Sequence, residues 1–204
     1  MTPITVWRAA LALCVAAAVP AAKAQPVPAG PSVTAADLRF MQEMIGHHQQ
    51  AVEMTALLPS RTRRADMRTL GERIAISQSD EIAIMRQWLR KHGTTESAAP
   101  DAASHTMPGH AMPDHATSAH EGHAMPGMLT ATQMQALRAA TGARFDRLFL
   151  DGMIQHHGGA LAMVDSLLTT PGAAQESSLN RFVIDVVSDQ RAEIARMRRM
   201  RSAP

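Results

Sequence analysis

The chain has 204 residues, of which 46% are apolar and 19% are charged, so it can bury a substantial core. Aromatic residues make up only 3%, and Tyr is absent, whereas there are 15 Met and 10 His. This composition favours packed helices over a β-sheet, because strands favour aromatic and β-branched side chains. The scarcity of aromatic rings also argues against a stacking surface for single-stranded nucleic acid.

The N-terminal residues 1–24 are predicted to be a secretory signal peptide. Arg8 precedes an apolar run over residues 9–19 that is too short to span a bilayer, and residues 22–24 form a small-x-small cleavage pattern. Cleavage near Ala24 would place the mature protein in the periplasm or outside the cell, without stable membrane insertion. It would also leave equal numbers of basic and acidic residues, so the formal charge of +2 does not indicate nucleic-acid binding. The single cysteine, Cys14, would be lost, which excludes disulfides and thiolate metal sites from the mature chain.

Two helical hairpins are predicted in chain order. After an extended spacer over residues 25–34, apolar residues at three- and four-residue steps predict helices over 35–58 and 64–91, with Thr34 as N-cap and Pro59 as the stop. These helices form a first hairpin within residues 35–92. Residues 93–129 lose this periodicity and are predicted to be a flexible linker rich in His and Met. Helices resume over 130–168, with a break at 141–142, and over 174–200, as a second hairpin within residues 130–204.

The two halves of the chain repeat each other. At a constant offset of 109, many residues of the segment 37–54 meet an identical residue in the segment 146–163. In the second helix of each half, Gln78 and Glu81 correspond to Gln190 and Glu193. The repeat predicts that residues 35–204 form one domain, an all-α four-helix bundle built from two similar hairpins joined by the linker.

A paired motif within the repeat is the first candidate metal site. It reads Met44-x-x-His47-His48-x5-Met54 in one half and Met153-x-x-His156-His157-x5-Met163 in the other. Residues three, four and seven apart share one helical face, so two facing copies could bring the imidazoles and thioethers to one seam. Such ligands without carboxylates favour Cu(I) or Ag(I). The alternative is that Met fills the core and His is capped or solvated, and the spacing does not decide which His of each pair points inward.

The linker is the second candidate metal site. A segment without apolar periodicity cannot bury its Met residues in a core, so Met interleaved with His favours soft-metal binding there. A low-complexity tether is the alternative. The predicted ligands of the linker are Met107, His110, Met112, His115, His120, His123 and Met125.

Catalytic motifs are weak, and the chain is predicted not to be an enzyme. A di-iron carboxylate bundle needs Glu-x-x-His on two helices and two further Glu residues. Here Glu43 precedes His47 by four residues and its repeat partner is Gly152, so the carboxylates are not duplicated at this position. Neither a Ser-His-Asp arrangement nor a zinc-protease motif is found.

The repeated pattern Phe-x3-Met-Ile-x-His-His-x2-Ala-x2-Met, followed by Gln-x2-Glu-Ile-x2-Met, resembles an exported bacterial family of ferritin-like four-helix proteins known as a domain of unknown function. The resemblance covers roughly residues 35–92 and 126–201. Because some members are periplasmic copper-binding proteins, it implies a ferritin-like bundle and copper handling by the Met and His residues of both motifs.

The function predicted from these features is that of an exported copper-binding protein for sequestration, resistance or delivery. Cu(I) is the favoured ion, with Ag(I) and Cu(II) as further candidates, and the expected partners are metal ions and other periplasmic copper-handling proteins. The alternatives are a ferritin-like redox metalloenzyme and a metal-independent envelope stress or interaction protein.

Overall fold

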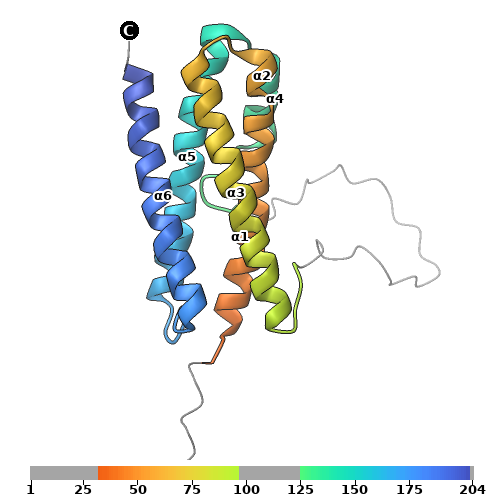
Figure 1. Cartoon of the computed structure of the whole chain (residues 1–204), viewed down its shortest axis with the longest axis vertical. Coiled ribbons are helices and arrows are strands. Elements are labelled where there is room, and N and C mark those ends of the chain that lie inside the picture. The colour runs from red at the N-terminus through yellow and green to blue at the C-terminus, as the bar shows by residue number, and fades with distance from the viewer. Residues whose placement is uncertain (1–31, 97–124, 203–204) are drawn as a thin grey trace, which may run out of the picture.

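A computed structural model describes residues 32–96 and 125–202, and within these ranges every helix or strand element is helical. The all-helical prediction is therefore confirmed for the described part of the chain. Four long helices lie side by side (Figure 1). They are α1 (Ala35–Ala56), α3 (Ala65–Lys91), α5 (Gly142–Thr169) and α6 (Ser177–Ser202).

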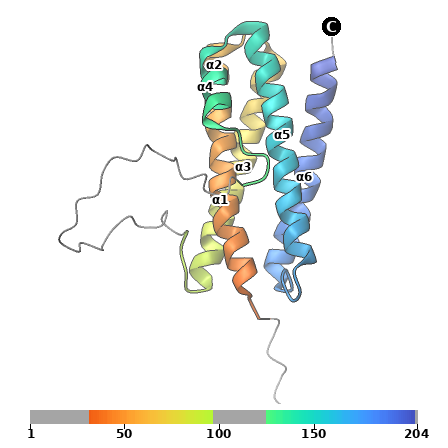
Figure 2. The same cartoon turned by 180° about the vertical axis from the view of Figure 1, so that it is seen from behind.

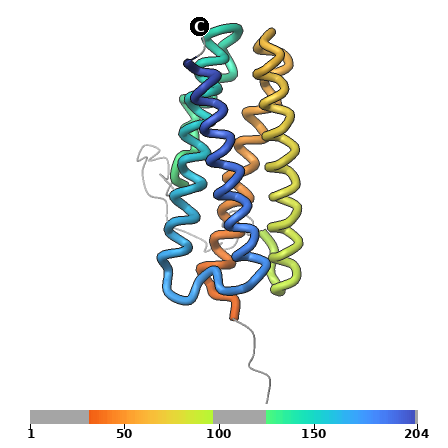
Figure 3. Tube along the Cα trace, turned by 60° about the vertical axis from the view of Figure 1, so that its left-hand side comes forward, coloured from red at the N-terminus to blue at the C-terminus, as the bar shows by residue number. Residues whose placement is uncertain are grey.

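Two short helices, α2 (Leu58–Arg61) and α4 (Ala131–Ala139), lie at one end of the long helices (Figure 2). The trace shows that α1 and α3 run antiparallel to each other, as do α5 and α6 (Figure 3). Helices α1 and α5 are antiparallel as well, since the N–H of Ala174 beyond the end of α5 donates to Asp37 at the start of α1, at 2.7 Å. No helix of the described residues is long and apolar enough to cross a membrane.

The start of α1 follows the sequence prediction, whereas its end does not. The Thr34 hydroxyl accepts from the Asp37 N–H at 3.1 Å, and the Asp37 carboxylate accepts from the Thr34 N–H at 2.8 Å, which forms a capping box. One helix was expected over residues 35–58, but α1 ends at Ala56 and a separate short helix, α2, begins at Leu58. Pro59 lies in the first turn of α2, where its missing N–H would have no intrahelical partner in any case.

The interior consists of two apolar clusters with polar residues between them. One cluster lies toward the α5–α6 turn and includes Met41, Met85 and Leu179, and the other lies toward α2 and α4 and includes Met67 and Phe149. Along each of the four long helices, buried polar residues fall between the members of one cluster and those of the other. We call this set the polar layer; its members are His47, His48, Gln78, Glu81, His156, His157 and Gln190.

Candidate metal centre

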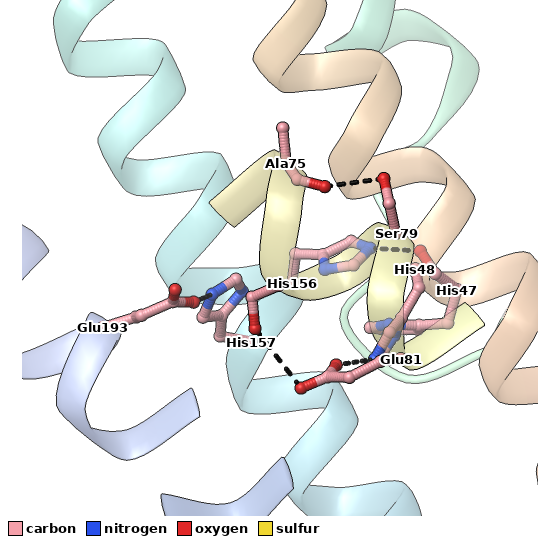
Figure 4. Close-up of polar contacts among 9 residues, drawn as sticks. His47, His48, Ala75, Ser79, Glu81, His156, His157 and Glu193 are labelled. Carbon is pink, nitrogen blue, oxygen red and sulfur yellow. Dashed lines mark hydrogen bonds and ion pairs between the residues drawn. The ribbon is translucent and has the colours of Figure 1, made fainter. Parts of the chain in front are cut away.

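The four histidines of the polar layer are all buried, and they form an inner and an outer pair. His47 on α1 and His156 on α5 meet across the two helices, with ring centroids 3.9 Å apart and ring planes at 39° (Figure 4). His47 and His48 are adjacent on α1 and point in different directions, with ring centroids 6.3 Å apart. His48 therefore faces α3, and His157 faces α6.

The outer histidines make the same contact in both halves of the chain. The Nε2 atom of His48 lies 2.5 Å from Glu81 Oε2, and that of His157 lies 2.5 Å from Glu193 Oε2 (Figure 4). An ionised carboxylate can only accept a hydrogen bond, so Nε2 of each ring carries the hydrogen. The Nδ1 atoms are left with their lone pairs when the rings are neutral.

The inner histidines donate to backbone carbonyl groups. His47 Nε2 donates to the oxygen of Pro126 at 2.9 Å, and His156 Nε2 donates to the oxygen of His47 at 2.9 Å. Because a carbonyl oxygen accepts only, each Nε2 carries the hydrogen and each neutral ring keeps a lone pair on Nδ1. The second of these bonds also joins α5 directly to the backbone of α1.

Burial keeps the inner pair neutral. Removal from water lowers the pKa of His47 to about 4, against a smaller opposing effect of its hydrogen bond to Pro126. Removal from water also lowers the pKa of His156 to about 2, and the neighbouring His47 adds to the effect. At neutral pH the Nδ1 atoms of these two rings are therefore unprotonated. A metal ion could bind their lone pairs without displacing a proton.

The polar layer contains an excess of hydrogen-bond acceptors. The Nδ1 atoms of all four histidines and the Oε1 atoms of Gln78 and Gln190 are buried without a hydrogen-bond partner. Buried polar atoms nearly always have a partner, so a group of unmatched acceptors calls for a specific cause. Histidines that bind metal through one ring nitrogen usually donate the other N–H to a carboxylate or a backbone carbonyl, and all four rings show this pattern. The layer is thus suited to a cation.

The thioethers of the paired motif flank the polar layer on both sides. Met44 and Met163 belong to the apolar cluster near the α5–α6 turn, whereas Met54 and Met153 belong to the cluster near α2 and α4. All four side chains are buried. One seam was expected for the imidazoles and thioethers, but α1 and α5 are antiparallel, which reverses the order of the two motifs and divides the thioethers between two flanks. Each flank therefore holds one Met from each copy of the repeat.

In the part of the chain that the structure describes, carboxylate and histidine side chains do not form a ready-made site for a hard metal ion. Within residues 32–96 and 125–202, no group of three or more His, Cys, Asp or Glu is arranged to hold a metal. A zinc or di-iron site would need at least three such ligands. Histidine pairs with thioethers nearby instead suit Cu(I) or Ag(I), which accept few ligands and bind sulfur well.

Most of the predicted linker ligands lie outside the described residues. They are Met107, His110, Met112, His115, His120 and His123. Met125 is described and packs, partly buried, against the cluster near the α5–α6 turn. Its methyl carbon lies 3.6 Å from the position that a Cβ atom on Gly46 would occupy. The linker was expected to be flexible as far as residue 129, but residues 125–129 pack against α1 and α5 because hydrogen bonds and close glycine contacts hold them there.

Four functional candidates were missed by sequence reasoning: Gln78, Glu81, Gln190 and Glu193. Their spacing is repeated in both halves, and that repeat was the available signal. Glu43 and its repeat partner Gly152 lie on the same helices as the histidines, and this position has no duplicated carboxylate. The duplicated carboxylates lie instead on α3 and α6, from which they reach the outer histidines.

Comparisons with known proteins place this geometry in context. The family described as domain of unknown function DUF305 matches residues 37–201. A DUF305 fragment from Deinococcus radiodurans has a similar structure, with a TM-score of 0.65, 26% identity, and coverage of 83% of this chain and 97% of the fragment. A DUF305 protein from Streptomyces coelicolor, described as a candidate secreted protein, has a TM-score of 0.63, 26% identity, and coverage of 79% and 89%.

A third similar structure is that of CopM in its Cu(II)-bound form, with a TM-score of 0.60 and 25% identity. The match covers 81% of this chain and 95% of CopM. CopM has also been solved in Cu(I)-bound, Ag-bound and apo forms, which are similar to this chain in fold. Comparison with curated proteins finds no match.

Proposed function

The chain belongs to the DUF305 family, and on that premise we propose that it is an exported copper-binding protein. Its role would be sequestration, resistance or delivery of copper. Cu(I) is the favoured ion, and Ag(I) and Cu(II) are further ions it would accept. The proposal includes a ferritin-like arrangement of the bundle, a signal peptide over residues 1–24 and a periplasmic or secreted location.

One observation carries this proposal. All four buried histidines have Nε2 held by a carboxylate or a backbone carbonyl, and all four have a buried Nδ1 without a partner. Fixing one ring nitrogen orients the ring and leaves the other nitrogen ready to bind metal. The copper- and silver-bound forms of CopM support the same chemistry, since they are metal-bound forms of a protein with a similar fold.

The ligands proposed for the bundle site come from both the polar layer and its flanks. His47 and His156 lie closest together, so they are the proposed central pair, with His48 and His157 as further nitrogen ligands. Thioethers would approach from either flank: Met44 and Met163 from one side, Met54 and Met153 from the other. The linker residues, from Met107 to Met125, form a second and weaker class of site, because a segment that must order itself around an ion binds less tightly than a rigid one.

A binding role is proposed in preference to an enzymatic one. Redox catalysis on a di-iron centre would require a cluster of carboxylates and histidines, and the described residues hold no such group of three or more. Glu81 and Glu193 are each engaged by a histidine. The partners proposed for the chain are metal ions and other periplasmic copper-handling proteins.

The test is an anaerobic Cu(I) titration against a competing chelator. The double variant H47Q/H156Q removes both inner Nδ1 atoms and keeps a side-chain N–H that can donate to the same carbonyl groups. H92Q is the matched control, since His92 lies at the end of α3, outside the polar layer. A third variant lacks residues 97–124 and therefore retains residues 125–129.

We expect the wild-type protein and H92Q to show one tight class of site and additional weaker sites. H47Q/H156Q should lose the tight class and keep the weaker one, and the deletion should do the reverse. Circular dichroism would confirm that each variant remains helical. If the deletion abolishes all Cu(I) binding while H47Q/H156Q binds as the wild type does, the polar layer has a structural role only.

A further inference from the structure

The last segment of the linker, residues 125–129, crosses the face formed by α1 and α5 (Figure 2). We call residues 125–129 the strap; they are Met125, Pro126, Gly127, Met128 and Leu129. The carbonyl of Pro126 in the strap is the group that accepts the hydrogen bond from His47 Nε2, at 2.9 Å. The strap is thus in direct contact with His47, one member of the inner histidine pair.

Besides His47, helix α1 holds the strap through the side chain of Gln50. The Gln50 amide donates to the oxygen of Leu129 at 3.0 Å and accepts from the nitrogen of Leu129 at 2.7 Å. Both backbone groups of Leu129 are therefore bound by one residue. On the other side, the Gln155 side chain on α5 donates to the oxygens of Gly127 and Met128 at 3.4 Å.

Helix α5 and the strap touch backbone to backbone. A Cβ atom on Gly159 would lie 1.9 Å from the oxygen of Pro126, and one on Gly127 would lie 2.5 Å from the oxygen of Gln155. Gly127 also has a φ of 75°, which side-chain-bearing residues rarely adopt. Both residues must therefore be glycine for the strap to reach this position.

The strap accounts for two of the positions at which the two copies of the repeat differ. It crosses the α1–α5 pair once, so equivalent positions on the two helices meet different parts of it. Gln50, which binds Leu129, is replaced by Gly159 in the second copy, where the backbone of the strap needs the space. Gly46, beside Met125, is replaced by Gln155, which donates to the strap. The Met and His residues of the paired motif, which are the proposed metal ligands, are the same in both copies, whereas the residues that seat the strap differ.

We propose that the strap determines which nitrogen of His47 binds metal, and that Gly159 and Gln50 are the positioning residues that seat it. With Nε2 donating to Pro126, only Nδ1 of His47 can bind an ion. The equivalent nitrogen of His156 is held by α1 itself, so the strap controls the inner pair from one side only. This inference rests on the proposed metal-binding function and assigns to the strap the regulation of that site.

Two variants test the proposal, each with a control substitution at the adjacent position. G159A places a methyl group where the Pro126 carbonyl lies, and G158A is its control because a Cβ atom on Gly158 meets nothing within 4 Å. Q50A removes both hydrogen bonds to Leu129 without adding a clash, and Q49A is its control at the exposed neighbouring position. The probe is Ag(I), a diamagnetic analogue of Cu(I), added to the full-length protein labelled with 15N in histidine.

In the wild-type protein, G158A and Q49A, we expect Ag(I) to shift the Nδ1 resonance of His47, with Nε2 remaining protonated. In G159A and Q50A, the Nε2–H signal should be lost to exchange with water already in the metal-free protein. Their Ag(I) affinity should fall about tenfold to a hundredfold, as is usual when the partner that orients a ligand is lost. A purely structural role of the strap would leave the choice of nitrogen unchanged.

The outcomes separate this inference from the proposed function. If G159A and Q50A keep the protected Nε2–H signal and bind Ag(I) through Nδ1 with wild-type affinity, the strap does not position His47. If the wild-type ring nitrogens do not respond to Ag(I), the proposed metal site is wrong. In that case the inference fails whatever the Nε2–H signal does. If the signal survives in G159A and Q50A, the strap does not position the ring of His47. If the signal is lost, the strap orients a histidine that has only a structural role.

Discussion

Acidification is predicted to destabilise the metal-free protein well above the pH at which carboxylates titrate. Burial lowers the pKa of His47 to about 4 and that of His156 to about 2, from an ordinary value of 6.5. Below pH 6.5 the unfolded chain binds protons at these two positions and the folded chain does not. Stability is therefore fully present above pH 6.5, and it falls as the pH drops toward about 4.

The magnitude follows from proton linkage. Each histidine that is protonated only in the unfolded state removes up to about 1.4 kcal/mol per pH unit from the free energy of unfolding. His47 and His156 together remove up to about 2.7 kcal/mol per unit, or roughly 5 kcal/mol between pH 6.5 and 4.5. That is comparable with the whole stability of many domains, which is about 5–15 kcal/mol.

The assay is urea unfolding followed by circular dichroism at several pH values between 7 and 4.5. The double variant H47Q/H156Q should lose most of the pH dependence in this range, whereas H92Q should retain it. A free energy of unfolding that stays constant from pH 6.5 to 4.5 in the wild-type protein would refute the reasoning. So would an equal slope in H47Q/H156Q, because the protons would then bind elsewhere.

Three further predictions concern stability. T34A removes the N-cap of α1 and should lower the free energy of unfolding by about 1 kcal/mol in chemical denaturation. Although partial burial opposes ionisation, hydrogen bonds from Ser178, Trp88 and the backbone lower the pKa of Glu176 to about 2. Its stabilising effect should be present above pH 4.5 and disappear toward pH 2, and E176Q should flatten the pH profile there. G158A should raise stability by up to about 1 kcal/mol through helix propensity, whereas G159A should lower it, as thermal unfolding would show.

Features that depend on local spacing could be predicted from the sequence. Apolar periodicity indicated the helices, and Thr34 as N-cap indicated the start of α1, which the structure confirms. The repeat identified the paired motif, because a match of this length in a constant register reflects the same local geometry in both halves.

Features that depend on how the helices meet could not be predicted. Consecutive His residues on one helix diverge by about 100°, so the inner pair is chosen by the crossing of α1 and α5, and not by the motif itself. The division of the thioethers between two flanks follows from the antiparallel direction of those helices. The strap depends on contacts between Pro126 and residues far away in sequence, His47 and Gly159, which no local pattern reveals.

The central claim is that the polar layer binds a soft metal ion through the buried histidines. The most direct measurement is anomalous scattering at the copper edge from crystals of the full-length protein loaded anaerobically with Cu(I). We expect an anomalous peak between α1 and α5 within bonding distance of Nδ1 of His47 or His156, with a methionine sulfur from one flank nearby. Anomalous peaks found only outside the polar layer, with all four Nδ1 atoms remote from copper, would contradict the claim.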